Sequence, residues 1–493
     1  MKGDNDDMHN DIIKFLDIKD AGIKMVSIKE TATTKTITLE KELACNYCDA
    51  CGSRMYSKGI YTRTVNHPIL QDGHKLILKI KQRRWICSNP LCKETAVDEF
   101  SFVDKYRRNT NLSDILIVEA FKNPLISAAE IGKRFNVSDS HAIQTFARYV
   151  DMPRRQLSEA ISIDEVDLDF SKYCKYALVI QDFLNGEPID LVRSRREQVT
   201  FPYFLDIPLN ERRKVKYIIS DMYKPYLGYK DKYFPNATSV VDAFHVIQAI
   251  NREYLNYIRK VIRRLDAEDK ERHEQLEQEF GRELPFNHSK DYKLLKTYNW
   301  MLLKNSQNLQ TYSQPRFNKR LGRMMTTYDY FEWFDKIDSS FLPRYEEKEK
   351  YIAFNLKYAG DPKGASKALP LIIDEYRNSR HKMFRDIAQM LEYYFDPIIN
   401  SFVMVQKYNG TTTRLSNGPM EALNRLSKDM KRAGRGYRNF EYLRNRFLYA
   451  HRKNAAILGT PKKLSETYLA FNPGRTPEED FFDTFDEEYD DDF

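Results

Sequence analysis

The segment that decides the fold is residues 161–245, which contains five short runs rich in apolar residues. In chain order these runs are Ile161-Ser-Ile-Asp-Glu-Val-Asp-Leu168, Tyr176-Ala-Leu-Val-Ile-Gln-Asp-Phe183, Pro188-Ile-Asp-Leu-Val-Arg193, Val215-Lys-Tyr-Ile-Ile-Ser-Asp221 and Ala237-Thr-Ser-Val-Val-Asp-Ala-Phe-His245. Asn-Gly stands between the second and third runs and predicts a hairpin, because both residues tolerate positive φ. A polar stretch after the third run predicts a helix. The segment therefore reads as three strands, a helix and two further strands.

Acids stand on the first and fourth of these strands, in the α/β order of a ribonuclease-H-like core. Asp164 lies inside the first strand and Asp221 ends the fourth. Two carboxylates brought together by a short sheet repel each other, and oxygen ligands favour Mg²⁺ or Mn²⁺ to stabilise the pair. Two such ions, about 3.5–4 Å apart, activate a water or a 3′-hydroxyl and stabilise the leaving oxygen. Glu165 is a weaker candidate, because strand alternation predicts that it points to the opposite face.

A third acid is expected from a helix, and Glu421 in Ser416-Asn-Gly-Pro-Met-Glu-Ala-Leu-Asn-Arg425 is the candidate. Gly-Pro breaks the chain just before it, and Pro suits the first helical turn. Glu421 shares a helix face with Arg425, Lys428 and Arg432, so this face can bind a metal at its start and DNA phosphates along its length. The alternative is an ordinary Glu–Arg surface pair, which contributes only about 0.3–0.5 kcal/mol.

The order of these motifs resembles the ISL-three family of bacterial insertion-sequence DDE transposases. The resemblance is carried by Ile219-Ser-Asp-Met-Tyr-Lys-Pro-Tyr226, Phe234-Pro-Asn-Ala237, Val241-Asp-Ala-Phe-His245, Ser416-Asn-Gly-Pro-Met-Glu-Ala-Leu-Asn424 and Arg435-Gly-Tyr-Arg-Asn-Phe440. It implies that Asp164, Asp221 and Glu421 are the catalytic acids. It also implies that Lys428, two turns after the Glu, contacts DNA. One departure is Ala422, where the family usually has Gly.

Five of the six cysteines fall between residues 45 and 92, which favours a metal site over disulfides. Two pairs, Cys48 with Cys51 and Cys87 with Cys92, flank a basic β-like stretch and fit a four-thiolate zinc ribbon. Cys45 is a competing ligand. The alternatives are free reduced thiols or a redox pair. In the resembling family this ribbon belongs to the half that binds the DNA ends.

Residues 112–150 predict a helix-turn-helix, with Ser127 capping the first helix and Asn136-Val-Ser138 forming the turn. The second helix is expected from Ser140 to Tyr149. The residues near its start that can meet base edges are Ser140, His141, Gln144 and Thr145, and Arg148 further along can reach phosphate. Ordinary packing of a helix pair is the alternative.

Further candidates lie at the ends of the third and fifth strands. Arg193, Arg195 and Arg196 close the third strand and either grip DNA or form a solvated strand end. Asp242 ends the strand beside that of Asp221, so we expect it to support the metal site rather than bind the metal. His245 is expected in the same supporting role, or as a structural residue.

Composition indicates a multidomain protein with a polyanionic partner. The net charge is +8 although ten acids crowd into residues 478–492, so the rest of the chain is far more basic than the total. Neither a signal peptide nor an apolar run of membrane length is apparent, so a cytoplasmic protein is expected. The predicted parts are an N-terminal segment (1–43), the zinc ribbon (44–104), the helix-turn-helix (105–153), the first part of the core (154–250), an all-helical insertion (251–405), the second part of the core with Glu421 (406–460) and an acidic disordered tail (461–493).

The sequence thus predicts a transposase that binds the terminal inverted repeats of its own element. It would use two Mg²⁺ or Mn²⁺ ions to cleave double-stranded DNA at the ends and join the freed 3′-hydroxyls to target DNA. Joining two ends implies a homodimer or a larger assembly. A catalytically silent DNA-binding regulator and a nuclease without strand transfer are the alternatives.

Overall fold

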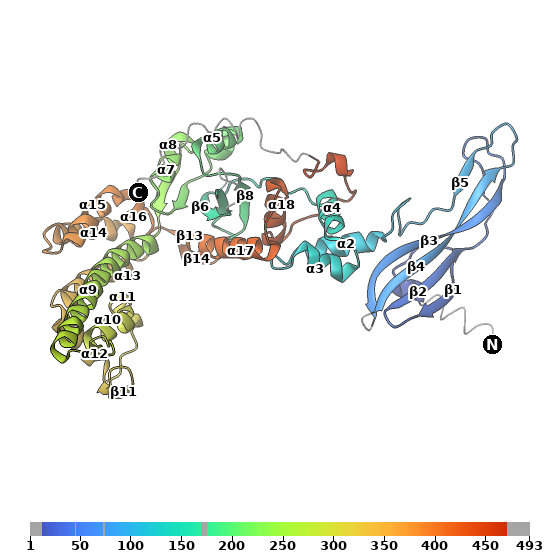
Figure 1. The fold of residues 1–493 in the computed structure, drawn as a ribbon. Helices are drawn as coiled ribbons and strands as arrows, with labels where there is room; N and C mark the ends of the chain where they lie inside the picture. Colours follow the sequence, from blue (N-terminus) through green and yellow to red (C-terminus); the bar gives the residue numbers. More distant parts are fainter. Residues whose placement is uncertain (1–11, 45, 72–73, 169–174, 471–493) are drawn as a thin grey trace. The chain divides into compact units, whose positions relative to one another are not determined.

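The computed structural model describes residues 12–44, 46–71, 74–168 and 175–470 (Figure 1). Cys45 and the acidic stretch after Glu478 lie outside these residues. The chain forms two compact units. The first comprises Met1–Arg154, Asp167–Tyr176 and Arg425–Phe493, and the second comprises Arg155–Val166 and Ala177–Asn424. Both units combine sheets with helices, so the mixed α/β class predicted from the sequence is confirmed.

The first unit opens with a five-stranded sheet. Its strands are β1 (Ile23–Glu30), β2 (Thr34–Lys41), β3 (Met55–Gln71), β4 (His74–Cys87) and β5 (Thr95–Val97), in the order β1-β2-β4-β3 with β5 on β4. Alternation in β2 and β4 points one face inward, where Leu39, Leu78 and Ile80 are fully buried. β2 pairs in parallel with β4. The predicted N-terminal segment and the predicted zinc ribbon therefore share one sheet.

The first unit also contains a helical cluster that joins distant parts of the sequence. Its helices are α2 (Asn111–Ala120), α3 (Ala128–Phe135), α4 (Asp139–Tyr149), α18 (Phe440–His451) and the short η2 (Leu464–Glu466). The ring of Phe146 lies 4.8 Å from that of Phe121 and 5.5 Å from that of Tyr449. Arg446 is fully buried and donates to the carbonyl oxygens of Phe121, Asn123 and Ile126, which follow α2. Helix α18, which the sequence places in the second part of the core, thus packs with the predicted helix-turn-helix.

The second unit is built on another five-stranded sheet, in the order β10-β9-β6-β7-β8. The elements of this part are β6 (Ala160–Asp167), β7 (Tyr176–Asp182), β8 (Pro188–Val192), α5 (Glu197–Asp206), α6 (Leu209–Arg212), β9 (Tyr217–Ser220), α7 (Lys224–Leu227), α8 (Tyr229–Lys232) and β10 (Thr238–Val241). β6, β9 and β10 run parallel to one another, and β7 pairs with β8 in the antiparallel direction. The strands predicted from the sequence all form, with a helix between the third and the fourth.

The β7–β8 turn differs from the two-residue turn that Asn185-Gly186 predicts. Gly186 has a φ of +77°, but Asn185 is not among the residues with positive φ. Asp182 closes the wider turn: its carboxylate accepts from the backbone N–H of Leu184 at 2.9 Å, and its carbonyl accepts from that of Gly186 at 2.8 Å. The hydrogen bonds of Asp182 therefore stabilise a turn in which only Gly186, and not Asn185, has a positive φ.

A largely helical insertion follows β10. Its elements are α9 (Ala243–Phe280), α10 (Lys290–Tyr298), α11 (Trp300–Leu303), η1 (Ser306–Asn308), β11 (Arg316–Asn318), β12 (Arg323–Met325), α12 (Thr327–Ile337), α13 (Phe341–Lys357), α14 (Pro362–Arg377), α15 (Lys382–Tyr393) and α16 (Phe395–Asn400). Two short strands, β13 (Met404–Gln406) and β14 (Thr412–Arg414), precede α17 (Gly418–Gly434). The prediction of an all-helical insertion is wrong at β11–β12, where Gly322, with a φ of +67°, turns the chain back into a hairpin.

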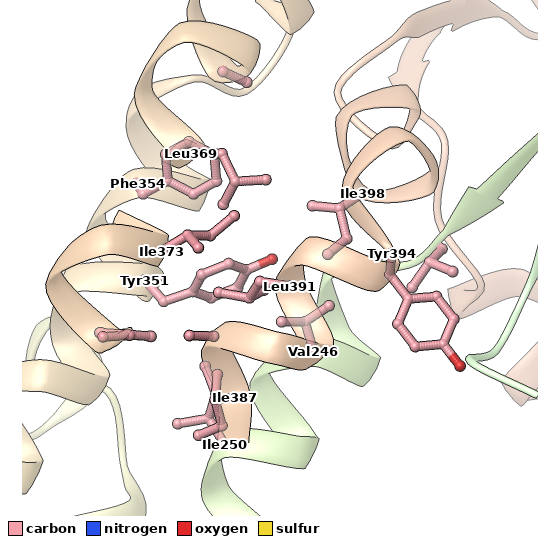
Figure 2. Close-up of a cluster of buried hydrophobic side chains, with 14 of the residues drawn as sticks. Val246, Ile250, Tyr351, Phe354, Leu369, Ile373, Ile387, Leu391, Tyr394 and Ile398 are labelled. Carbon is pink, nitrogen blue, oxygen red and sulfur yellow. The ribbon is translucent and has the colours of Figure 1, made fainter. Parts of the chain in front are cut away.

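The insertion is joined to the sheet through one apolar core. Figure 2 shows Val246 and Ile250 of α9 facing Ile387, Leu391 and the neighbouring helices. Val241 of β10 belongs to the same buried cluster. Apolar contacts therefore continue from the last strand of the sheet into the insertion. Among the described residues, none of the helices has both the length and the apolar character of a membrane span.

Candidate active site

Three carboxylates meet at one edge of the second unit's sheet. β6 pairs with β9 up to Ser162 and Ile219, and continuing that register sets Asp164 opposite Asp221. One oxygen each from Asp164, Glu165 and Asp221 lies within 4.8 Å of the other two. The expectation that Glu165 points away from the cluster is therefore wrong, although β6 continues as a strand to Asp167 beside β7.

Glu165 is held in this cluster by two partners. Its carboxylate accepts from the guanidinium of Arg195 and from the hydroxyl of Tyr226, both at 2.9 Å. Tyr226 is fully buried. Burial and the charge of Asp221 raise the pKa of Glu165, while the charge of Arg195 opposes the shift. Arg195, for which the sequence left open a DNA contact or a solvated strand end, thus forms an ion pair with an acid of the cluster.

The electrostatics of the cluster favour a cation. Burial raises the pKa of Asp164 to about 7, and the charges of Glu165 and Asp221 add to the shift. A carboxyl group with so high a pKa is costly to ionise beside two other acids. A divalent ion would offset that repulsion, and an all-oxygen donor set fits Mg²⁺ or Mn²⁺.

Two asparagines of the α17 segment bind Asp164 directly. The side-chain N–H groups of Asn417 and Asn424 donate to Asp164 Oδ2 at 3.3 and 3.0 Å, and that of Asn424 also reaches the carbonyl of Glu165 at 3.3 Å. Both residues are buried, and the Oδ1 atom of each has no hydrogen-bond partner within the described chain. The sequence analysis missed both residues.

Glu421 lies on the helix turn between these asparagines. It follows Asn417 by four residues and precedes Asn424 by three, which are the spacings of neighbours on one helix face. Its backbone N–H donates to the carbonyl of Asn417 at 3.0 Å. Within the described residues, the group of carboxylates that lie within 4.8 Å of one another does not include Glu421. The structure therefore places Asp164 and Asp221 in one cluster. The helix face that carries Glu421 lies beside Asp164, because the two asparagines on that face donate to its carboxylate.

Asp242 connects β10 to this arrangement. It is buried, caps α9 by accepting from the backbone N–H of Phe244 at 3.1 Å, and accepts from that of Asn417 at 2.9 Å. It thereby fixes the residue that precedes α17. His245 is half-buried in the first turn of α9, and its Nδ1 has no hydrogen-bond partner among the described residues.

Four cysteines form a second candidate site, in the first unit. The Sγ atoms of Cys48, Cys51, Cys87 and Cys92 all lie within 4.8 Å of one another. The Cys48–Cys92 and Cys51–Cys87 sulfur distances are 3.7 and 3.4 Å. A Zn–S bond of about 2.3 Å places tetrahedral sulfurs roughly 3.8 Å apart, so the cluster fits zinc. Hydrogen bonds from Ser53 lower the pKa of Cys51 to about 6, whereas burial raises the pKa of Cys87.

Comparison with known proteins identifies the family of the chain. A family model described as a transposase, DDE_Tnp_ISL3, matches residues 161–447, more than half of the chain. The chain belongs to this transposase family. The transposase for insertion sequence element IS1001 of Bordetella parapertussis is 21% identical over 302 residues, which cover 59% of this chain and 67% of that protein. The resemblance drawn from the motifs is therefore confirmed.

The second helix of the predicted helix-turn-helix presents only some of the transposase's expected DNA contacts. Ser140 and Gln144 are exposed on α4. His141 is half-buried with its Nε2 2.9 Å from the amide nitrogen of Asn109. Thr145 is buried, so it cannot reach a base without a rearrangement. The exposed positions near the start of α4 remain the better candidates.

Arg148, expected to reach phosphate, is engaged within the unit. Its Nε donates to the carbonyl of Lys462 at 2.9 Å, and its guanidinium lies 3.9 Å from Asp114. The backbone N–H of Lys462 in turn donates to the carbonyl of Arg148 at 2.9 Å. Part of the segment predicted to be a disordered tail therefore packs along α4.

The remaining basic candidates differ in exposure. Arg193 is partly buried at the end of β8. Arg425 and Lys428 are exposed on α17, as is Arg432, which pairs with Asp429 at 3.1 Å. The helix face that begins with Glu421 thus continues as a run of exposed cations, as the sequence predicts.

Proposed function

We propose that this transposase binds the terminal inverted repeats of its own insertion sequence, cleaves DNA at the ends and transfers the freed strands to target DNA. The observation that carries the proposal is the meeting of Asp164, Glu165 and Asp221 at the end of two parallel strands. Three acids with one oxygen each within 4.8 Å of the others, and with the pKa of one raised to about 7, form a site that a divalent cation would stabilise.

The strand order supports a ribonuclease-H-like core. Numbered along the chain, the strands lie in the order third, second, first, fourth and fifth, and the acids stand on the central first strand and its parallel neighbour. This order sets the ends of β6 and β9 side by side. The helical insertion then returns the chain to the same edge, where Asp242 holds the start of α17.

Asp164, Asp221 and Glu421 are proposed to hold two Mg²⁺ or Mn²⁺ ions, with Glu165 as a further ligand. Bound there, the ions would activate a water or 3′-hydroxyl for in-line attack on phosphorus and stabilise the leaving oxygen. Asn417 and Asn424 orient Asp164 through its Oδ2 atom. Arg195 balances the charge of Glu165. No covalent protein–DNA intermediate is required, so no Ser or Tyr nucleophile is assigned.

End recognition is proposed to reside in the first unit. The four-cysteine cluster fits a structural zinc ion, and the exposed start of α4 suits the recognition helix of a helix-turn-helix. Lys428 and the cations beside it on α17 would contact the phosphates that flank the cleaved bond. Joining two ends in one reaction requires at least a dimer on DNA.

The test is cleavage of a duplex that carries the element end, compared with a duplex of scrambled sequence. Wild type should nick the end duplex with Mg²⁺ or Mn²⁺ and not with EDTA, and should yield donor–target joint products. Asp221→Asn should bind the end duplex and fail to nick it. End binding with no metal-dependent nicking by wild type would instead identify a silent regulator. Nicking without joint products would identify a nuclease.

A further inference from the structure

The β11–β12 hairpin of the insertion (labelled at β11 in Figure 1) has two unlike faces. The strands are antiparallel, and Phe317 stands directly opposite Met324. Both side chains are exposed, by 62% and 52%. Their neighbours Asn318 and Met325 point the other way and are buried. The hairpin therefore carries a cross-strand apolar pair on its outward face.

The inward face fixes the hairpin to the insertion. The side-chain N–H groups of Asn318 donate to the hydroxyls of Tyr298 and Tyr330 at 2.8 and 2.6 Å. Its Oδ1 accepts from the backbone N–H groups of Arg320 and Leu321 at 3.0 and 3.2 Å, which closes the turn. Leu321 is buried in the same apolar core as Met325. The outward pair is thus presented by a preorganised element.

The outward pair is surrounded by positive charge. The cations of the hairpin, all exposed, are Arg316, Lys319, Arg320 and Arg323. No acid occurs between Ser313 and Met325. Within the described part of the chain, none of the four cations lies within 4.0 Å of a carboxylate, whereas two of the guanidinium groups lie over the rings of Tyr312 and Trp333, at 4.5 and 5.0 Å. The charges therefore remain available to an anionic partner.

We propose that this hairpin is a contact surface for double-stranded DNA, in addition to the first unit and the acid site. Four exposed cations, none of them in an ion pair within the described residues, match the phosphate backbone, whose neutralisation releases condensed counterions. Phe and Met are side-chain types that proteins insert at base steps from the minor groove. A second copy of the chain fits less well, because a symmetric contact of this surface with itself would oppose cations with cations. The inference rests on the proposed function, since it takes DNA as the partner.

The experiment measures the affinity of the full-length protein for an end-containing duplex at several salt concentrations, by fluorescence anisotropy. Arg320→Gln/Arg323→Gln is compared with Lys363→Gln/Lys367→Gln, which removes two exposed cations from α14 of the same insertion. Log affinity falls as log salt concentration rises, and each phosphate contact makes that fall steeper by about 0.9. The hairpin variant should therefore show a slope about 1.8 less steep than wild type, and the α14 variant should keep the wild-type slope.

A second variant tests the apolar pair. Phe317→Ala/Met324→Ala should weaken DNA binding about fivefold or more, because fivefold corresponds to the lower end of the energy of an aromatic contact with a base. The slope of log affinity against log salt should not change. Thermal melting of each variant checks that it is folded. Sedimentation without DNA checks self-association.

The outcomes separate this inference from the proposed function. Wild type that binds no duplex overturns both. Wild-type binding together with hairpin variants that keep wild-type affinity and slope overturns the hairpin surface alone. Loss of self-association with DNA binding intact would make the hairpin an interface between copies, and would equally overturn the proposal.

Discussion

Asn424→Ala tests whether the α17 amides prepare the acid cluster for metal. The change removes a donor that lies 3.0 Å from Asp164 Oδ2 and 3.3 Å from the carbonyl of Glu165. A hydrogen bond to a charged group contributes about 1.5–3 kcal/mol, and the loss of a group that orients a metal ligand typically costs about 10–100-fold in metal affinity. Because Asn417 still donates to the same oxygen at 3.3 Å, we expect the lower end, about tenfold.

The assay is the Mn²⁺ concentration at half-maximal nicking, together with Mn²⁺ binding by calorimetry. Both midpoints should rise about tenfold in Asn424→Ala, whereas end binding in EDTA should not change. Leu426→Ala, at a partly exposed position two residues along the same helix, is the control and should leave both midpoints at wild type. If Asn424→Ala kept the wild-type Mn²⁺ midpoints, the amide would have no part in organising the site.

Three further outcomes are expected. Burial and the neighbouring acids raise the pKa of Asp164 from 3.8 to about 7, so the protonated carboxyl stabilises the metal-free fold below pH about 4. That contribution is lost as pH rises through 7, and the melting temperature of wild type relative to Asp164→Asn should fall over this range without metal; a constant difference would contradict the shift. Cys51→Ser should lower zinc content, measured by atomic absorption, and end affinity while the acid site still binds Mn²⁺; full zinc content would remove Cys51 from the ligand set. Arg446→Met leaves buried carbonyls without their donor and should lower the free energy of unfolding in urea by about 1–3 kcal/mol, a loss that exposed Arg438→Met should not show.

The sequence was sufficient for those parts of the site that follow from regular pairing. Asp164 and Asp221 could be brought together in advance, because one is inside a strand and the other ends its parallel neighbour. Glu165 could not be placed, since alternation gives the direction in which a side chain leaves the strand but not where the end of a long side chain lies, and contacts with Arg195 and Tyr226 hold its carboxylate in the cluster. The cysteine cluster was predictable for a similar reason, as two close pairs on strand ends are brought together by one sheet.

Non-local contacts account for most of what the sequence analysis missed. Asn417 and Asn424 carried one usable signal, their spacing of four and three residues from Glu421 on one helix face, but nothing in the sequence alone shows that this face meets β6. The packing of α18 with the predicted helix-turn-helix could not be predicted from local sequence patterns either. Its place depends on the hydrogen bonds of Arg446, and on aromatic contacts that join Phe146 to Tyr449.

The buried position of Arg446 has a consequence for synthesis of the protein. The guanidinium binds carbonyls more than 300 residues earlier in the chain, at Phe121 and Ile126. The early helices therefore lack this partner until the ribosome has translated α18 (Phe440–His451). A polypeptide released before α18 would leave α2, α3 and α4 without these contacts, so a product that ends before α18 would have an incompletely packed helical cluster.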